Sequence, residues 1–473
     1  MNDITAFFAF LKYCLGYKEN MSRVIAGMNW HELYSFASKQ ALLGLCFEGI
    51  ERLGEEYPEE LKRNPIGREL LMTWMGKAQQ IRRQNMKVNT VASKLFAMLR
   101  VDGMRCCILK GQGNALMYPN PYSRTPGDID VWIDASRERI MEYAQKKFEL
   151  EDDIRLQHLE TSLDGVPVEL HFFPCSMNNP IYHARLQKWF RRNADLQCSH
   201  IVGLPDGAGD IAIPTTAFNV IYQLCHLYHH FFDEGIGMRQ IIDYFLVVND
   251  FSKNVFLDND LSNHPVNFSN HPVPLSKEGS TFSPSPSSSG SGDVTAPSRC
   301  SEPLRSKDGG PSKVSPDCAG WDRLDAIGAS KVSPDCAGWD RLAIEGDNSA
   351  TAVTSSASTA LVVVQRELKY LGLWKFAGAV MYVLHKALGL SEEKMIAPMD
   401  EKRGKLLLAE ILNGGNFGRH FTKYGHFTQQ GMAKKYFLKI WRNMHFVRYF
   451  PAEALSEPIF RTWHFFWRLK HRR

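Results

Sequence analysis

Two aspartates separated by one residue, Asp128 and Asp130, stand at the start of an apolar run in this chain. The run continues through Val131, Trp132 and Ile133, which is typical of a strand that is at least partly buried. Side chains at positions i and i+2 of a strand point to the same face, so we expect the two carboxylates to project together. Carboxylates held side by side repel each other unless a cation lies between them. The spacing therefore predicts a divalent metal site, and a solvated turn is the alternative.

A turn upstream of the two aspartates has the composition of a phosphate-binding loop. An apolar strand end is followed by Lys110, Gly111 and Gly113, and then by a helical pattern. A turn of this kind between a strand and a helix offers backbone amides to an anion. The glycines would allow close approach of the backbone, and Lys110 could pair with phosphate as a compact charge. A lysine at a strand end before an ordinary turn is the alternative.

A third carboxylate is expected downstream of this pair. Residues 165–173 read as a short strand after a turn, with Val168 and Leu170 on one face and Glu169 and His171 on the other. We therefore predict Glu169 as the third metal ligand and His171 as a residue that lines the cleft. A solvated strand carboxylate is the alternative for Glu169.

Taken in order along the chain, these motifs resemble those of a known family, the uncharacterised nucleotidyltransferases of the DNA polymerase β superfamily. The motifs that carry the resemblance are Leu109-Lys110-Gly111, Tyr118-Pro119, Arg124, Gly127 to Asp130, and Glu169-Leu170-His171. The resemblance extends to a helical segment with His226 to Phe231, Gly237 to Gln240 and Asp243. It covers most of the chain except residues 252–360. A single Asp-x-Asp motif would be weak, whereas the ordered set is specific.

The resemblance implies an NTP substrate, transfer of a nucleoside monophosphate to a hydroxyl, and release of pyrophosphate. Asp128, Asp130 and Glu169 would hold two Mg²⁺ ions, for which Mn²⁺ could substitute. One ion would bind the triphosphate and the other would lower the pKa of the attacking hydroxyl. Arg124 would reach the β or γ phosphate or brace the acids. The acceptor stays open, because an RNA end, a protein hydroxyl or a small molecule would each fit.

Two positions depart from the superfamily's pattern. Its phosphate loop is usually Gly-Ser, whereas this chain has Lys110-Gly111, so a serine hydroxyl contact is missing. The third carboxylate is commonly Asp, and Glu169 is longer by one methylene. Two alternatives therefore stay open: a catalytically inactive nucleotide-binding or interaction module of the same fold, and a metal-dependent NTP hydrolase.

The elements that must position these residues follow from the hydrophobic periodicity. Residues 1–100 read as a helical cap, residues 101–213 as a catalytic core of strands and helices, and residues 214–251 as helix. We therefore expect an α+β fold, a polymerase β-like core with a mixed sheet and flanking helical segments. In the helix after the core, His226, His229, His230 and Asp233 share one face. We interpret His226 and His230 as cleft lining, with a transition-metal site as the alternative.

The composition changes abruptly over residues 252–360, which are rich in Ser, Pro and Gly. A thirteen-residue string that starts at Ser312 recurs unchanged from Ser330. Such a segment buries too little apolar surface to offset its ordering entropy, so we predict a disordered insert. Residues 361–473 read as a C-terminal helical domain that ends in a basic, aromatic tail. That tail could contact nucleic acid or an acidic surface, and solvated charges on a packed helix are the alternative.

The overall composition is that of an ordinary globular protein. The chain has 473 residues, of which 44% are hydrophobic and 23% charged, and its net charge of +5 does not by itself indicate nucleic acid. The ten cysteines include no Cys-x-x-Cys pair, which favours reduced thiols. No apolar run approaches the roughly 20 residues of a membrane-spanning helix. We therefore expect a cytoplasmic protein with no transmembrane segment.

Overall fold

A computed structural model describes residues 3–150, 155–256, 353–420 and 432–471. The chain divides into two units, residues 1–262 with 348–473, and residues 263–347. The second unit lies outside the described residues, as does most of the insert predicted over 252–360. Helix α11 (Met238–Phe256) extends past residue 252, and helix α12 (Val353–Tyr370) begins before residue 360. The two ends of the predicted insert are therefore helical.

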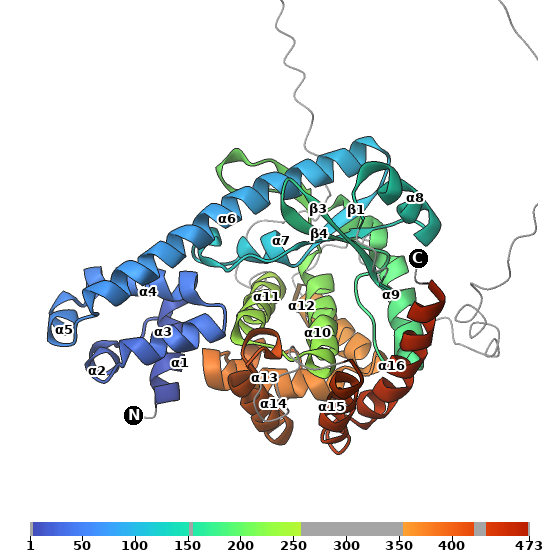
Figure 1. Ribbon diagram of the computed structural model, residues 1–473. Coiled ribbons are helices and arrows are strands. Elements are labelled where there is room, and N and C mark those ends of the chain that lie inside the picture. Colours follow the sequence, from blue (N-terminus) through green and yellow to red (C-terminus); the bar gives the residue numbers. More distant parts are fainter. Residues whose placement is uncertain (1–2, 151–154, 257–352, 421–431, 472–473) are drawn as a thin grey trace, which may run out of the picture. The chain divides into compact units, whose positions relative to one another are not determined.

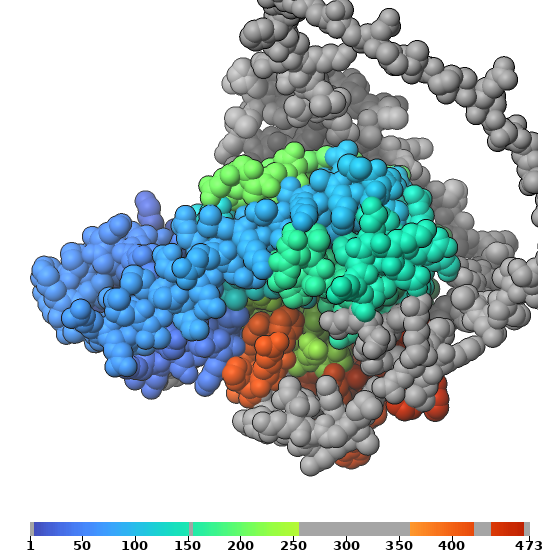
Figure 2. Space-filling model, turned by 45° about the horizontal axis from the view of Figure 1, so that its top comes forward, coloured from blue at the N-terminus to red at the C-terminus, as the bar shows by residue number. Residues whose placement is uncertain are grey.

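The chain starts with helices that lead to the sheet. These are α1 (Asp3–Cys14), α2 (Ser22–Ala26), α3 (Trp30–Lys39), α4 (Leu43–Glu56), α5 (Pro58–Arg63) and α6 (Arg68–Val101). Helix α6 runs from the N-terminal helices to the sheet (Figure 1) and forms part of the surface in the space-filling view (Figure 2). Trp74, near its start, belongs to one hydrophobic core and Leu95, near its end, belongs to another. The helix therefore packs against both cores.

The central sheet is mixed, which confirms the predicted α+β class. Its strands are β1 (Cys106–Leu109), β2 (Ile129–Ile133), β3 (His158–Leu163) and β4 (Val166–His171), in the order β1-β2-β4-β3. Strand β4 runs parallel to β2 and antiparallel to β3, and β1 runs antiparallel to β2. In this register Asp130 lies opposite Glu169. The parallel pair thus brings together two carboxylates that are far apart in sequence.

Both faces of the sheet are covered, and the alternation of side chains decides what each face carries. Val131 and Leu170 pack into the core that α6 shares with helix α8 (Arg137–Lys147). Trp132, on the other face of β2, packs against aromatic side chains of helices α9 (Pro180–Ser199) and α10 (Thr216–Asp233). Because the side-chain period of a strand is two, Asp130 shares the second face with Trp132. The acids therefore point toward the helical layer.

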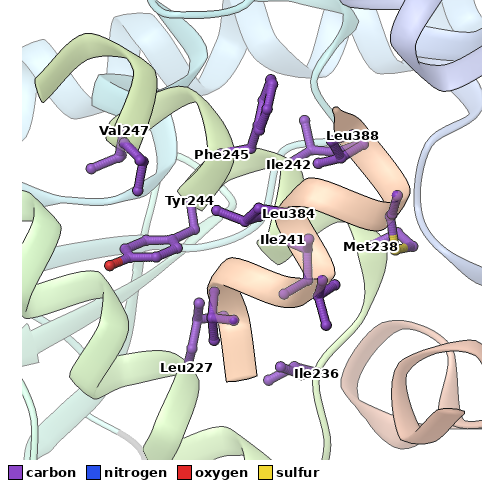
Figure 3. Packing of buried hydrophobic residues seen from close by; sticks show 14 of the residues in the cluster. Leu227, Ile236, Met238, Ile241, Ile242, Tyr244, Phe245, Val247, Leu384 and Leu388 are labelled. Carbon is purple, nitrogen blue, oxygen red and sulfur yellow. The ribbon is translucent and has the colours of Figure 1, made fainter. Parts of the chain in front are cut away.

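The remaining elements complete this unit. They are α7 (Gly111–Ala115), η1 (Pro121–Ser123), β5 (Ile201–Gly203), η2 (Pro205–Gly207), β6 (Asp210–Ala212), α13 (Trp374–Leu388), η5 (Glu392–Lys394), α14 (Glu401–Gly414), η6 (Asn416–Gly418), α15 (Met432–Met444) and α16 (Pro451–His471). Ile241 and Phe245 of α11 lie near Leu384 and Leu388 of α13 in a buried cluster (Figure 3). No helix of the described ranges has the length and apolar character needed to cross a membrane.

Several cations of the basic tail make contacts within the protein. Lys439 and Arg461 both pair with Asp233, at 2.7 and 3.1 Å. Arg442 is buried, with its Nη2 atom 3.7 Å from Glu410 Oε2. These contacts favour packed helices over a nucleic-acid surface for this part of the tail.

A buried carboxylate on α16 is expected to make stability depend on pH. Glu453 accepts the backbone N–H of Asn178 at 2.5 Å and that of Asn179 at 3.3 Å. Burial nevertheless raises the pKa of Glu453 from 4.5 to about 7. Between these values the folded chain binds more protons than the unfolded chain, so stability falls as pH rises. We expect this group to lower the free energy of unfolding by about 2–3 kcal/mol between pH 5 and pH 8.

Urea unfolding of the native chain and of Glu453→Gln at the two pH values measures this effect. The loss on raising the pH should be smaller by that amount in the variant, which cannot ionise. An equal loss in both proteins would mean that Glu453 does not couple folding to pH.

Candidate active site

All the site residues predicted from the sequence except Gly113 line one cavity of about 490 Å³. Its wall includes the β1–α7 turn, the start of β2, the end of β4, helices α10 and α11, and residues 417–419. Segments from the N-terminal, central and C-terminal parts of the sequence thus meet there. The lining residues predicted from the sequence are Lys110, Gly111, Arg124, Asp128, Asp130, Glu169, His171, His226 and His230.

The two aspartates differ in their surroundings. Asp128 is exposed and immediately precedes β2, whereas Asp130 is buried within the strand. The Asp130 carboxylate, together with desolvation of the Asp128 carboxyl within the cavity and the charge of Glu169, raises the pKa of Asp128 to about 6. Burial also acts to raise the pKa of Asp130, but Lys110 and His171 hold it well below its ordinary value. Asp130 therefore stays charged. The repulsion between the two carboxylates appears instead as the raised pKa of Asp128.

Lys110 is a fixed cation beside the acids. Its Nζ atom lies 3.0 Å from Asp130 Oδ1 and 3.0 Å from His226 Nε2. Burial acts to lower the pKa of Lys110, but the three carboxylates raise it overall, so the amine stays protonated. Because an ammonium group can only donate, His226 Nε2 accepts in this contact. The φ angle of Lys110 is +51°, a region that side-chain-bearing residues rarely adopt and that is often found at functional sites.

His171 joins Asp130 and Glu169. Its Nε2 atom lies 3.1 Å from Asp130 Oδ1 and 3.1 Å from Glu169 Oε2. Burial acts to lower the pKa of His171, but the two carboxylates raise it to about 9. Nε2 therefore carries a hydrogen and donates to both acids, since a carboxylate can only accept. His171 orients the carboxylates as well as lining the cavity.

The structure adds a histidine that the sequence analysis missed. His158 on β3 places its Nδ1 atom 3.4 Å from Glu169 Oε2, and burial lowers the pKa of His158 to about 3. With Glu169 and His171 it forms a group whose potential ligand atoms lie within 4.8 Å of one another. The sequence does offer a signal for it. His158 and Glu160 alternate with the apolar Leu159 before the turn at Gly165, as expected of a strand with one polar face.

Arg124 lies deeper than its predicted partners. Its Nε and Nη2 atoms donate to the two carboxylate oxygens of Asp243 at 2.8 and 2.7 Å, and both residues are buried. Tyr118 donates its hydroxyl to the same carboxylate at 2.7 Å. Of the two roles expected for Arg124, this bidentate pair favours bracing the site over contact with phosphate.

The two glycines of the predicted phosphate turn have different surroundings. Gly111 lines the cavity, and its φ of +37° suits a residue without a side chain. Gly113 is not among the residues that line it. A Cβ atom at Gly113 would lie 3.0 Å from Ile213 Cγ2, so its small size makes room for that side chain. The structure thus gives Gly113 a packing role.

The histidines of α10 also face the cavity. His226, His229 and His230 line it, and burial lowers the pKa of each of them. Asp233, the fourth member of this helix face, is engaged by Lys439 and Arg461. Because Asp233 is already paired with two cations, this helix face favours cleft lining over a separate transition-metal site. Two further lining residues to which the sequence analysis gave no role are Arg239 and Phe417.

Comparisons with known proteins identify the family of this chain. No curated protein matches the chain. One similar solved structure is the crystal structure of an antigenic nucleotidyltransferase-like protein from Paracoccidioides brasiliensis. It is 18% identical over 34% of this chain and 75% of that chain, with a TM-score of 0.24. The profile of a family described as "uncharacterised nucleotidyltransferase" matches residues 26–262, which is half of the chain. The chain therefore belongs to this uncharacterised nucleotidyltransferase family.

Proposed function

We propose that this protein transfers a nucleoside monophosphate from an NTP to a hydroxyl acceptor, releases pyrophosphate and depends on Mg²⁺. Membership of the nucleotidyltransferase family supports the class of reaction. The observation that carries the proposal is the parallel pairing of Asp130 with Glu169 beside Asp128, in one cavity. The acceptor is an RNA end, a protein hydroxyl or a small molecule.

The three carboxylates fit a divalent metal. Mg²⁺ and Mn²⁺ prefer oxygen ligands, and Asp128, Asp130 and Glu169 offer three carboxylates around one space. The repulsion between Asp128 and Asp130, which raises the pKa of Asp128, would be relieved by a divalent cation between them. These residues would hold two ions, which when bound would neutralise phosphate charge and favour deprotonation of the acceptor hydroxyl.

Other residues of the cavity would keep this centre in position. His171 donates to Asp130 and Glu169 and so fixes the orientation of both acids. Lys110 contacts the same oxygen of Asp130 as His171 does and adds positive charge where phosphate would enter. Gly111 lets the backbone of the turn approach that phosphate. The buried pair of Arg124 and Asp243 supports the segment that precedes Asp128.

Label transfer tests this proposal. The purified chain and its Asp128→Asn, Asp130→Asn double variant are incubated with each α-³²P-labelled NTP, Mg²⁺ and a cell extract. RNA, protein and small molecules are then separated. We expect label in one fraction with the native chain, none with the double variant, and none when EDTA removes the metal. Absence of both label and pyrophosphate with the folded native chain would contradict the proposal.

One contact favours a second candidate, an inactive nucleotide-binding module. Lys110 already places a positive charge 3.0 Å from Asp130, where it could take over part of a metal's role. Such a module would bind NTP equally well with and without Mg²⁺, whereas the proposed enzyme requires Mg²⁺ for tight binding. Turnover of NTP without a labelled acceptor would instead indicate the hydrolase alternative.

A further inference from the structure

Arg239, near the start of α11, is a buried cation in the wall of the active-site cavity. Arg239 is only 8% exposed, and it lines the cavity. One of its nitrogens, Nη1, donates to the backbone oxygen of Thr125 at 3.1 Å. Its Nε atom is buried and makes no hydrogen bond among the described residues. Part of the hydrogen-bonding capacity of this guanidinium is therefore unused.

Arg239 also makes no ion pair within the described parts of the chain. The carboxylate one helical turn away, Asp243, has both oxygens engaged by Arg124 and one shared with Tyr118. Burial and the positive charge of Arg124 lower the pKa of Arg239 despite the opposing effect of Asp243, whereas the direct pair with Asp243 raises the pKa of Arg124 despite its burial. A buried charge without a partner is costly, so its presence in a cavity indicates an anionic ligand.

A turn from the C-terminal region holds Arg239 in place. Phe417 belongs to the 414–419 turn, and its ring centroid lies 5.6 Å from the Arg239 guanidinium carbon. The backbone of this turn is unusual, with a φ of +53° at Phe417 and of +64° at Gly415. A Cβ atom at Gly237 would lie only 2.7 Å from Asn416 Cα, so the turn packs closely on the start of α11. Phe417 is thereby fixed beside Arg239 in a cation–π contact.

The position of Arg239 relative to the acids indicates which anion it would meet. A Cβ atom at Gly127 would lie 3.8 Å from Arg239 Nη1, and Gly127 directly precedes Asp128. An anion bound by Arg239 would therefore lie next to the proposed metal ligands. Arg419, which is exposed, lines the same cavity and adds positive charge. Arg124, the arginine singled out in the sequence, is occupied by Asp243.

We propose that Arg239, held by Phe417 of the 414–419 turn, binds the polyphosphate tail of the nucleotide. The assignment of that phosphate to an NTP rests on the proposed function, whereas the anion site itself rests on Arg239 alone. The turn lies outside the residues matched by the family profile. This chain would thus complete its substrate site with a segment from beyond the region that defines the family.

Calorimetric titration of the full chain with inorganic tripolyphosphate, in EDTA, tests the site without metal or catalysis. We expect Arg239→Gln to weaken binding at least about tenfold, because charge-assisted hydrogen bonds are lost. Phe417→Leu should weaken it about two- to fivefold through loss of the cation–π contact. As a matched control, Arg105→Gln removes an exposed arginine paired with Asp134 and Asp195 and should leave binding unchanged. Equal affinity of the native chain and Arg239→Gln would overturn the proposal.

Thermal unfolding without ligand separates a binding role from a structural one. Loss of an uncompensated buried charge should leave the Tm of Arg239→Gln unchanged or raise it. Tripolyphosphate should raise the Tm of the native chain and not that of the variant. A lower Tm for Arg239→Gln in the absence of ligand, with an undiminished shift on adding tripolyphosphate, would assign Arg239 to folding and contradict the proposal.

Two further comparisons identify the source of the phosphate and separate this inference from the catalytic one. ATP should bind with the same dependence on Arg239 as tripolyphosphate, whereas equal binding of AMP or of a short oligoribonucleotide would point to an acceptor phosphate and overturn the assignment. The Asp128→Asn, Asp130→Asn variant should still bind tripolyphosphate. Binding that depends on Arg239 in a chain without transferase activity would sink the proposed function and leave the anion site intact. Nucleotidyl transfer that is unaffected by Arg239→Gln would overturn the phosphate-binding role of Arg239 and leave the proposed function intact.

Discussion

Replacing Asp130 by Asn is expected to lower the rate of nucleotidyl transfer by at least about 10³-fold while leaving the chain folded. Asparagine has the same size and can still accept the hydrogen bond from His171, so the local packing is kept. It loses the negative charge, however, and with it the strongest oxygen ligand for a divalent cation. Asp128 and Glu169 remain near Lys110 and limit the cost of leaving that amine without its closest partner.

Asp134→Asn is the matched control for this variant. Asp134 directly follows the same strand, pairs with Arg105 and is not among the residues that line the cavity. The same chemical change there should leave the transfer rate within about twofold, since a pair of this kind contributes little. Rates, circular dichroism and thermal unfolding of the two variants provide the comparison. Full activity of Asp130→Asn would exclude this carboxylate from the reaction.

Replacing Arg124 by Gln is expected to destabilise the protein by about 3–5 kcal/mol, the largest stability effect that the site offers. The change leaves Asp243 buried, with Tyr118 as its remaining hydrogen-bond donor. A buried carboxylate that loses its bidentate ion pair is costly, because most of the attraction that offset its desolvation is gone. Urea unfolding with equal m-values for the two proteins would give the difference.

The double variant Arg124→Gln, Asp243→Asn tests this cause. Removing the second charge should recover much of the lost stability, because two neutral amides replace the broken ion pair. The double variant should then be less destabilised than the sum of the two single variants, which gives a large coupling free energy between Arg124 and Asp243. If the double variant is as unstable as the sum of the two single changes, the pair does not act as a unit.

Local patterns in the sequence account for much of the sheet and the site. The alternation through β2 and β4 predicts which side chains are apolar and buried, and Val131 and Leu170 do lie in the core. The motif with Lys110 and Gly111 does join a strand to a helix, and both residues line the cavity. Such features follow from periods of two and from turn chemistry, which depend only on neighbouring residues.

Other features depend on partners that no local pattern identifies. Asp130 meets Glu169 because β4 inserts between β2 and β3, an order that alternation does not specify. Arg124 pairs with Asp243 at a separation of 119 residues, and this contact favours the bracing role. Gly113 has the glycine expected of a phosphate turn but is needed to accommodate Ile213. In each case the tertiary contact involves a partner that neighbouring residues in the sequence do not reveal.

Arg239 is a residue for which the sequence suggests a partner that the structure does not provide. In the sequence it is an arginine at the start of a helix, with a carboxylate four residues later that could pair with it. The structure gives that carboxylate to Arg124 and leaves Arg239 buried without an ion pair among the described residues. Its significance therefore arises only from the competition between two arginines for one partner.

Titration with Mn²⁺, followed by electron paramagnetic resonance in the presence of a non-hydrolysable NTP analogue, tests the central claim most directly. Free Mn²⁺ gives a signal that is lost on binding to the protein or to the analogue, so subtracting a titration of the analogue alone gives the number of ions bound by each variant. The account predicts two bound ions per native chain and none for the Asp128→Asn, Asp130→Asn, Glu169→Gln variant. It also predicts that His158→Gln, which removes a histidine beside Glu169, leaves that number unchanged. Failure of the native chain to bind Mn²⁺, or equal binding by the triple variant, would contradict the assignment of the three carboxylates as the metal centre.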